Sequence, residues 1–181
     1  MIRSRGDLYG VGMPAAPGQH YRAFIRFARR HIGGSALDLG CGFGAYGGEL
    51  ARLGVNCVGC DVNPEYLRTA AAGGLMVVQV GSTLPFADRS FDSVLMFEVV
   101  EHVEDLDRIL SEAFRVARKN VLITVPNSEK IEQMKAIETA IEARNGQMLS
   151  PVNSSLCCGS ESRLLVISTS GMSSRTPLTM G

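Results

Sequence analysis

Residues that could do chemistry gather in three short stretches, each at the end of an apolar run. The first is Leu37–Gly47, LDLGCGFGAYG, in which glycines alternate with other residues behind the carboxylate of Asp38. The second ends at Asp61, and the third, FEVVEHVED, spans 97–105. Alternating glycines allow positive φ angles and let a ligand approach the backbone, while carboxylates and imidazoles accept or transfer protons. These stretches indicate a ligand site with acid–base groups beside it.

The glycine turn is compatible with more than one ligand. The phosphate-binding turn of an NTPase requires a lysine after its last glycine, and the first lysine of the chain is Lys119, so that class is excluded. A dinucleotide turn requires Gly-x-Gly-x-x-Gly or Ala, a pattern that Gly40, Gly42 and Ala45 satisfy. Asp61 stands where such a site has its acidic residue. The glycines alone therefore leave a nicotinamide dinucleotide open.

Asp38 favours a different ligand. It lies two residues before Gly40 in an otherwise apolar run, where a carboxylate is costly unless it is paired. Pyrophosphate is a poor neighbour for this carboxylate. The ammonium group of an amino acid, or N–H groups and water around a methionine moiety, would be a good one.

Short apolar runs alternate with helical segments, and this alternation must position the three stretches. The expected strands are 35–40, 55–61, 75–80, 91–97 and 120–126, and the expected helices are 19–32, 44–53, 63–72, 104–118 and 128–144. Asn63 followed by Pro64 marks one helix start especially well. Strict alternation predicts right-handed crossovers and a doubly wound α/β fold with a mainly parallel sheet. Ligands bind such folds beyond the carboxyl ends of the strands, where these stretches fall.

Length and composition fit one soluble domain with additions at each end. Of the 181 residues, 45% are apolar and 20% charged, and the net charge is zero, so nothing favours nucleic acid or a membrane as partner. We divide the chain into a basic N-terminal segment with an amphipathic helix (1–34), an α/β domain (35–149) and a serine-rich, poorly ordered tail (150–181). The arginines of the first segment are interpreted as a solvated helix face. No segment resembles a signal peptide or a membrane span, so the expected location is cytoplasmic.

The five cysteines indicate a reducing compartment, because their spacing is unlike that of a disulfide framework. Cys57 and Cys60 form a Cys-x-x-Cys pair, but residues three apart in a strand point to opposite faces. A structural zinc site needs four ligands, and the other close pair, Cys157 and Cys158, is adjacent in sequence. We interpret Cys57 and Cys60 as small buried thiols, and no bound metal is expected at the cysteines.

Four segments, in order, resemble the class I S-adenosylmethionine-dependent methyltransferases, and in particular the type 11-like methyltransferase domain. ALDLGCGFG (36–44) is similar to the first motif of that family and VGCDVNPEYLRTA (58–70) to the second. Residues 84–105 and 115–127 are similar to the regions around its fourth and fifth strands. The resemblance implies a Rossmann-like methyltransferase fold, S-adenosyl-L-methionine as cofactor, and in-line methyl transfer to a small-molecule acceptor.

The resemblance also implies roles for individual residues. Those it places against the cofactor are Asp38, Leu39, Gly40, Cys41, Gly42, Gly44, Asp61, Val62, Ser82, Thr83, Leu84 and Phe97. Asp38 and the glycine backbone would surround the methionine end, Asp61 would bind the ribose hydroxyls, and Val62 would lie against the adenine. Relatives commonly carry an aspartate directly after Gly81, where it accepts from the adenine amino group. This chain departs from that pattern, because Ser82 stands there and the following link is shorter.

The stretch after the fourth expected strand supplies the candidate catalytic residues, Glu98 and His102. The cofactor carries an activated methyl group, so alignment alone supplies ~7 kcal/mol or more and no catalytic triad is needed. Three roles stay open for Glu98, Glu101 and His102: removing a proton, holding a divalent metal as a similar motif does in some relatives, or orienting the site.

The likeness to the family ends near Asn127. RLLVIST (163–169) is a candidate sixth strand, but the remaining segment lacks the expected patterning, so we expect the C-terminal strands to be incomplete. Two further functions stay open: an NAD-type nucleotide-dependent oxidoreductase, and a non-catalytic, truncated protein that binds S-adenosylmethionine.

Overall fold

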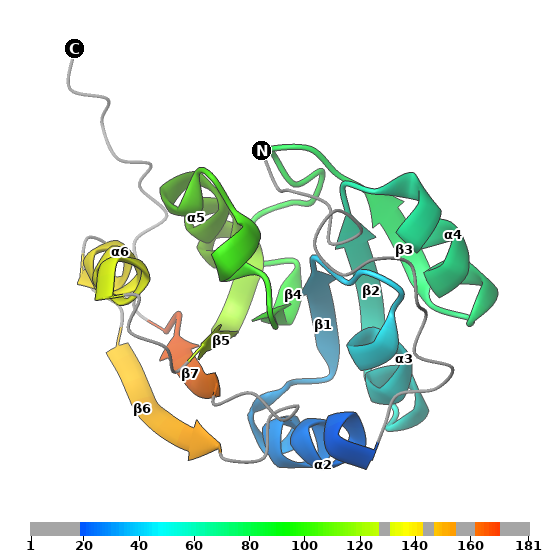
Figure 1. Ribbon diagram of the computed structural model, residues 1–181, viewed down its shortest axis with the longest axis horizontal. Helices are drawn as coiled ribbons and strands as arrows, with labels where there is room; N and C mark the ends of the chain where they lie inside the picture. Colours follow the sequence, from blue (N-terminus) through cyan, green and yellow to red (C-terminus); the bar gives the residue numbers. More distant parts are fainter. Residues whose placement is uncertain (1–18, 127–130, 143–146, 155–161, 171–181) are drawn as a thin grey trace.

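The chain folds around a seven-stranded sheet with the order β3-β2-β1-β4-β5-β7-β6 (Figure 1). The structure, a computed structural model, describes residues 19–126, 131–142, 147–154 and 162–170. The strands are β1 Ser35–Leu39, β2 Asn56–Asp61, β3 Met76–Gln79, β4 Phe91–Met96, β5 Ala117–Pro126, β6 Gln147–Ser154 and β7 Ser162–Ser168. Strands β1 to β5 pair in parallel, and β7 is antiparallel to both β5 and β6.

Helices cover both faces of this sheet. They are α2 Gln19–Ala28, α3 Ala45–Arg52, α4 Pro64–Ala72, α5 Leu106–Val116 and α6 Ile131–Glu142, with the short 3₁₀ turns η1 Arg29–His31 and η2 Val100–His102. One buried cluster packs α5 and α6 on the sheet, and a second packs α2, α3 and α4 on the other face. Figure 1 shows α5 and α6 on the opposite side of the strands from α2 and α3. The doubly wound fold predicted from the alternation is confirmed.

Local signals explain where several elements begin. The Asn63 side chain accepts a hydrogen bond from the Glu65 N–H at 2.9 Å, with Pro64 at the first helical position, so the predicted start of α4 is confirmed. Gly44, with φ 79°, stands at the N-cap of α3. None of the described helices combines the length and apolar character needed to cross a membrane.

The C-terminal strands are present in the sheet, so the expectation that they are incomplete is wrong. Residues 164–167 of β7 are buried and contribute in alternation to the two apolar clusters. β6 was not predicted because its sequence contains Pro151 and four polar residues. An edge strand tolerates proline because one of its sides needs no N–H donor. Part of the segment 150–181 thus belongs to the sheet, while 155–161 and 171–181 lie outside the described residues. The division of the chain into three segments stays a prediction.

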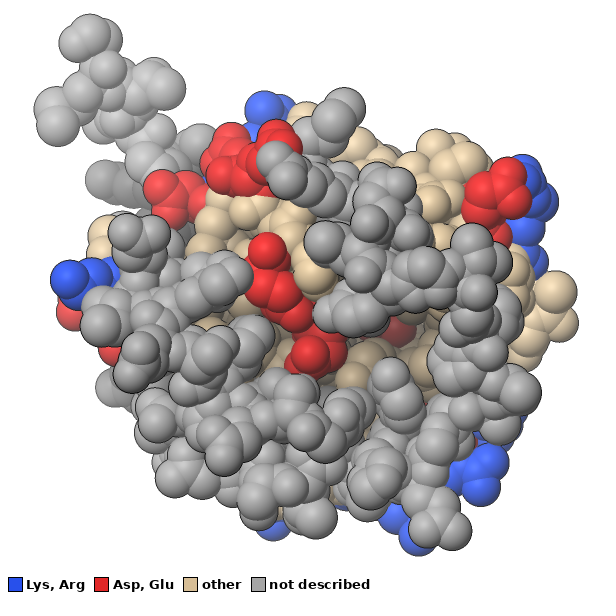
Figure 2. All heavy atoms as spheres, viewed as in Figure 1, with Lys and Arg blue, Asp and Glu red and all other residues tan. Residues whose placement is uncertain are grey.

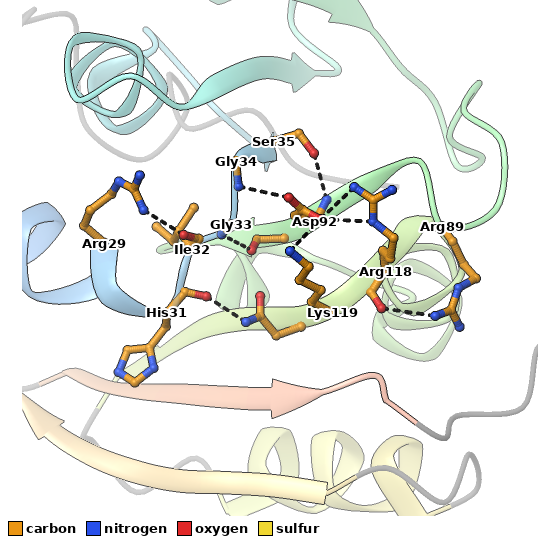
Figure 3. Close-up of polar contacts among 12 residues, drawn as sticks. Arg29, His31, Ile32, Gly33, Gly34, Ser35, Arg89, Asp92, Arg118 and Lys119 are labelled. Carbon is orange, nitrogen blue, oxygen red and sulfur yellow. Dashed lines mark hydrogen bonds and ion pairs between the residues drawn. The ribbon is translucent and has the colours of Figure 1, made fainter.

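The carboxylate of Asp92 ties together the amino ends of three strands (Figure 3). Its Oδ2 accepts from the Gly34 N–H, just before β1, at 2.9 Å, and its Oδ1 accepts from Arg118 of β5 at 2.7 and 3.0 Å. The hydrogen bonds from Arg118, assisted by Lys119 and the Gly34 N–H, lower the pKa of Asp92 to about 2. A Cβ on Gly33 would lie 2.3 Å from the Cβ of Asp92, so only glycine fits at this position without a shift of the backbone.

Candidate functional site

The glycine turn joins β1 to α3 and closes over the end of β2. The N–H groups of Gly40 and Cys41 both donate to the carbonyl oxygen of Cys60, at 2.8 and 2.9 Å. Gly40 has a φ of 77°, and a Cβ there would lie 2.7 Å from a methyl group of Val99. Gly42 has a φ of 53°, but an added Cβ would meet nothing within 4 Å. Gly40 is therefore required by packing as well as by conformation, whereas Gly42 borders open space.

Asp38 fixes the helix that leaves the turn. Its side chain is 1% exposed, and its Oδ2 accepts from the Gly47 N–H at 3.0 Å. Gly47 lies in the first turn of α3, whose N–H groups have no acceptor within the helix. A buried carboxylate requires a hydrogen-bond donor, and a backbone N–H supplies at least one of the donors to Asp38. The expected place of Asp38 beside the methionine end of a cofactor stays a prediction.

Asp61 connects the glycine turn to the start of α4. Its Oδ2 accepts from the Gly42 N–H at 3.0 Å, and its Oδ1 accepts from the Asn63 N–H at 2.9 Å. The residue is 7% exposed at the end of β2. A single carboxylate thereby fixes the glycine turn and the start of α4 relative to each other.

A cavity of about 740 Å³ opens beside the carboxyl ends of β2 and β3. Its lining residues are Val62, Asn63, Pro64, Val80, Gly81, Ser82, Val103, Asp105, Arg108 and Ile109. The branched aliphatic residues form apolar wall, and Asp105 and Arg108 are the charged members of the lining. Of the residues that the resemblance places against the cofactor, Val62 and Ser82 line this cavity. Leu84 does not, because it is 2% exposed and packs into the core.

The short link between β3 and β4 is held against α5 by polar side chains. Arg108 donates to the Thr83 hydroxyl at 3.2 Å, Glu112 accepts from the Leu84 N–H at 2.8 Å, and Arg115 donates to the Leu84 carbonyl at 3.0 Å. Arg108, Glu112 and Arg115 share one face of the helix because they are four and three residues apart. Hydrogen bonds from Arg115 lower the pKa of Glu112, which stays an acceptor. The link is thereby fixed as a wall of the cavity.

Glu98 adopts a strained backbone conformation directly after β4. Its φ is 56°, in the left-handed region that costs a residue with a Cβ about 1–2 kcal/mol. The Glu98 N–H donates to the hydroxyl of Thr124 at 2.7 Å, and that hydroxyl donates to Glu98 Oε1 at 3.0 Å. Thr124 is 1% exposed in β5. One buried hydroxyl therefore positions both the backbone and the carboxylate of Glu98.

The residues that follow Glu98 place more acidic groups at this end of the sheet. His102 Nε2 lies 3.6 Å from Glu101 Oε1, and both side chains are largely buried. Figure 2 shows acidic side chains gathered near the middle of one face, where β4 lies in Figure 1.

Phe97 is 2% exposed and packs edge to face against Tyr46, with 5.2 Å between the ring centroids, so it belongs to the core. Among the residues that the structure describes, no group of three His, Cys, Asp or Glu side chains is arranged to hold a metal ion.

The cysteines near the glycine turn are buried free thiols. Cys57 and Cys60 belong to the two different apolar clusters, as expected for residues on opposite faces of β2. Burial raises the pKa of both, and of Cys41, well above the ordinary value of a thiol. These side chains therefore stay protonated, which disfavours metal binding and nucleophilic chemistry.

Sequence reasoning missed three residues that the structure brings to the site. Thr124 carries a signal, because it is the polar residue within the apolar run VLITV (121–125). Asp105 ends the stretch 97–105, but nothing in the sequence distinguishes it from its acidic neighbours, and Arg108 stands in a helical segment rich in charged residues. Only the packing of α5 against the ends of β2 and β3 makes them cavity residues.

Comparisons with known proteins agree with this geometry. Residues 37–125 match the family model described as a methyltransferase domain. The chain is 35% identical over 123 residues to a ubiquinone biosynthesis O-methyltransferase of Mesorhizobium japonicum, covering 64% of this chain and 49% of that protein. It is 37% identical over 130 residues to a demethylmenaquinone methyltransferase of Corynebacterium efficiens, covering 69% and 56%. The chain thus spans about half the length of the curated relatives it matches.

A solved structure shows the same fold. The magnesium protoporphyrin IX methyltransferase of Synechocystis, crystallised with S-adenosylmethionine, superposes with a TM-score of 0.67 at 16% identity, over 90% of this chain and 88% of that one. At such identity the match concerns the fold alone. The match to the family model, which spans β1 to β5, shows that residues 37–125 of this chain belong to the family of methyltransferase domains.

Proposed function

We propose that the chain binds S-adenosyl-L-methionine across the glycine turn and the adjoining cavity, and transfers its methyl group to a small-molecule acceptor. The observation that carries this proposal is the position of Asp61. Its buried carboxylate bonds to Gly42 of the turn on one side and to Asn63, a cavity residue, on the other. A ligand held by Asp61 would therefore reach both the turn and the cavity.

The residues present fit this cofactor. Each oxygen of Asp61 accepts one backbone N–H and has a second lone pair, so the carboxylate can also accept from ribose hydroxyls. Gly42 has no side chain, so the space beside its backbone is open to the ligand. Apolar walls with few polar groups, as in the cavity beside Val62, suit a purine ring.

When bound, the sulfonium supplies an activated methyl group, so the protein must orient the acceptor, exclude water and, for a hydroxyl acceptor, receive a proton. Glu98 is the first candidate for receiving that proton. The next residue, Val99, packs against the glycine turn at Gly40, which keeps Glu98 close to the methionine end. Thr124 fixes its carboxylate, and His102 beside Glu101 is the second candidate.

The relatives support a small-molecule acceptor. Those compared above are named for ubiquinone biosynthesis, demethylmenaquinone and magnesium protoporphyrin IX. The zero net charge of the chain gives no general attraction to nucleic acid. The acceptor of this chain is thus proposed as a small organic molecule.

A titration followed by thermal denaturation tests cofactor choice. S-adenosylmethionine, S-adenosylhomocysteine and NAD are each added to the full chain. We expect S-adenosylmethionine and S-adenosylhomocysteine both to raise the melting temperature, with about 2.7 kcal/mol of stabilisation at a hundred times Kd. Stabilisation by NAD alone would overturn the proposal in favour of an oxidoreductase.

Turnover is tested separately, by release of S-adenosylhomocysteine in the presence of phenols, quinols and amines. We expect release above the acceptor-free rate with at least one of these classes. If the protein binds S-adenosylmethionine and S-adenosylhomocysteine but releases no S-adenosylhomocysteine with any acceptor, the result favours a binding protein over an enzyme.

A further inference from the structure

The cavity lacks an acidic residue directly after Gly81, where the resemblance to the family implies one. Ser82 follows β3 and lines the cavity, but its short hydroxyl cannot supply the charge of a carboxylate. The acidic residue in the lining is instead Asp105, one residue before α5. A carboxylate therefore enters this cavity from a different element.

The carboxylate of Asp105 has acceptor capacity to spare. Its Oδ1 accepts from the Arg108 N–H at 3.1 Å, which fixes the side chain at the start of α5. Its Oδ2 has no hydrogen-bond partner among the residues that the structure describes. Arg108 in turn bonds to Thr83, so the wall that carries Asp105 is joined to the wall formed by the short link. The acceptor is held in place before any ligand arrives.

We propose that Asp105 accepts a hydrogen bond from the exocyclic amino group of the adenine, and so selects adenine over hypoxanthine in the nucleoside of the cofactor. This inference rests on the proposed function. Adenine presents an amino donor at its C6 position, whereas hypoxanthine presents a carbonyl oxygen that a carboxylate repels. The aliphatic walls contact either ring equally, so discrimination falls to the carboxylate.

The test compares two ligands, S-adenosylhomocysteine and its deaminated counterpart S-inosylhomocysteine, by isothermal titration calorimetry on the full chain. The unaltered protein should bind S-adenosylhomocysteine roughly tenfold to a hundredfold more tightly than S-inosylhomocysteine, as expected for a hydrogen bond to a charged group. Asp105→Ser retains a residue that caps helices well but is too short to reach the base. We expect it to reduce the preference to about threefold or less, mainly by weakening S-adenosylhomocysteine.

Three further variants complete the design. Asp107→Ser removes a carboxylate from the same helical turn outside the cavity lining, and it should retain the full preference. Ser82→Ala should also retain it. Asp105→Asn keeps the size and capping ability of the side chain and should lose the preference, so a folding defect in Asp105→Ser would not obscure the result.

The possible outcomes separate the inference from the proposed function. If the unaltered protein binds neither S-adenosylhomocysteine nor S-inosylhomocysteine, the inference and the proposed function are both overturned. If it binds S-adenosylhomocysteine but Asp105→Ser and Asp105→Asn keep the unaltered preference, only the role of Asp105 is overturned. Loss of the preference in Ser82→Ala, with the Asp105 variants unaffected, would assign the amino group to the link after β3 instead.

Discussion

The carboxylate of Asp61 serves two backbone donors at once, in Gly42 and Asn63. Asp61→Ala leaves both N–H groups without this acceptor and removes the group proposed for the ribose hydroxyls. We expect the free energy of unfolding to fall by roughly 1–3 kcal/mol and S-adenosylhomocysteine to bind at least about tenfold more weakly. Urea denaturation and calorimetry measure the two effects. Glu65→Ala, which removes an exposed carboxylate from α4, is the control; unchanged binding in Asp61→Ala would contradict the site.

The strain at Glu98 can be measured by comparing two substitutions. Glu98→Gly and Glu98→Ala both remove the carboxylate, but only glycine adopts a φ of 56° without steric cost. We expect the glycine variant to be more stable than the alanine variant by about 1 kcal/mol. This difference is reduced by the greater conformational entropy of glycine in the unfolded chain. Urea denaturation checks the difference. Both variants should lose methyl transfer, which would indicate that the native protein retains the strained backbone in order to place the Glu98 carboxylate. An alanine variant more stable than the glycine variant would contradict backbone strain at this position.

Among the elements, β7 decides whether the sheet is complete. Its amides pair with β5 on one side and β6 on the other, and its apolar residues are buried on both faces. We expect hydrogen exchange of residues 164–167 to be as slow as that of β5, because opening either strand disrupts the same core. Mass spectrometry after pepsin digestion measures this. Exchange of β7 at the rate of an unfolded peptide would restore the expectation of an incomplete sheet.

Element boundaries were predictable where a local signal fixes them. Asn63 and Pro64 set the start of α4, and the apolar runs of β1, β2 and β4 lie within one residue of their expected limits. β6 was not predictable, because it is defined by its partner β7 rather than by its own polar, proline-containing sequence. Strand composition is informative for a buried strand and weak for an edge strand.

At the scale of the molecule, the site depends on contacts between distant elements. The sequence pattern places Asp38, Asp61 and Glu98 at strand ends, and the structure agrees. It gives no sign that Thr124 of β5 holds Glu98, or that Asp105 enters a cavity formed mainly after β2 and β3. Such pairings depend on the packing of whole elements, which residue spacing does not encode. Prediction from sequence therefore reaches the elements of the site but not its supporting side chains.

The groups proposed to bind the ligand lie at the carboxyl ends of the strands, whereas Asp92 joins the amino ends of three strands (Figure 3). The pKa of Asp92 is lowered from an ordinary 3.8 to about 2, so its carboxylate stabilises the fold fully above about pH 4, and that contribution is lost as the pH falls towards 2. Asp92→Asn should therefore lower the free energy of unfolding by roughly 1–3 kcal/mol at neutral pH.

The same difference between Asp92→Asn and the unaltered protein should shrink towards zero between about pH 4 and pH 2, because protonated Asp92 and asparagine are both uncharged. Urea denaturation across this range measures it, and the comparison cancels the titration of other carboxylates. S-adenosylhomocysteine should bind the variant within about twofold of the unaltered protein at neutral pH, since distant sites act independently. A difference that stays constant with pH would show that Asp92 contributes through packing instead, and weakened binding would show that the two ends of the sheet are coupled.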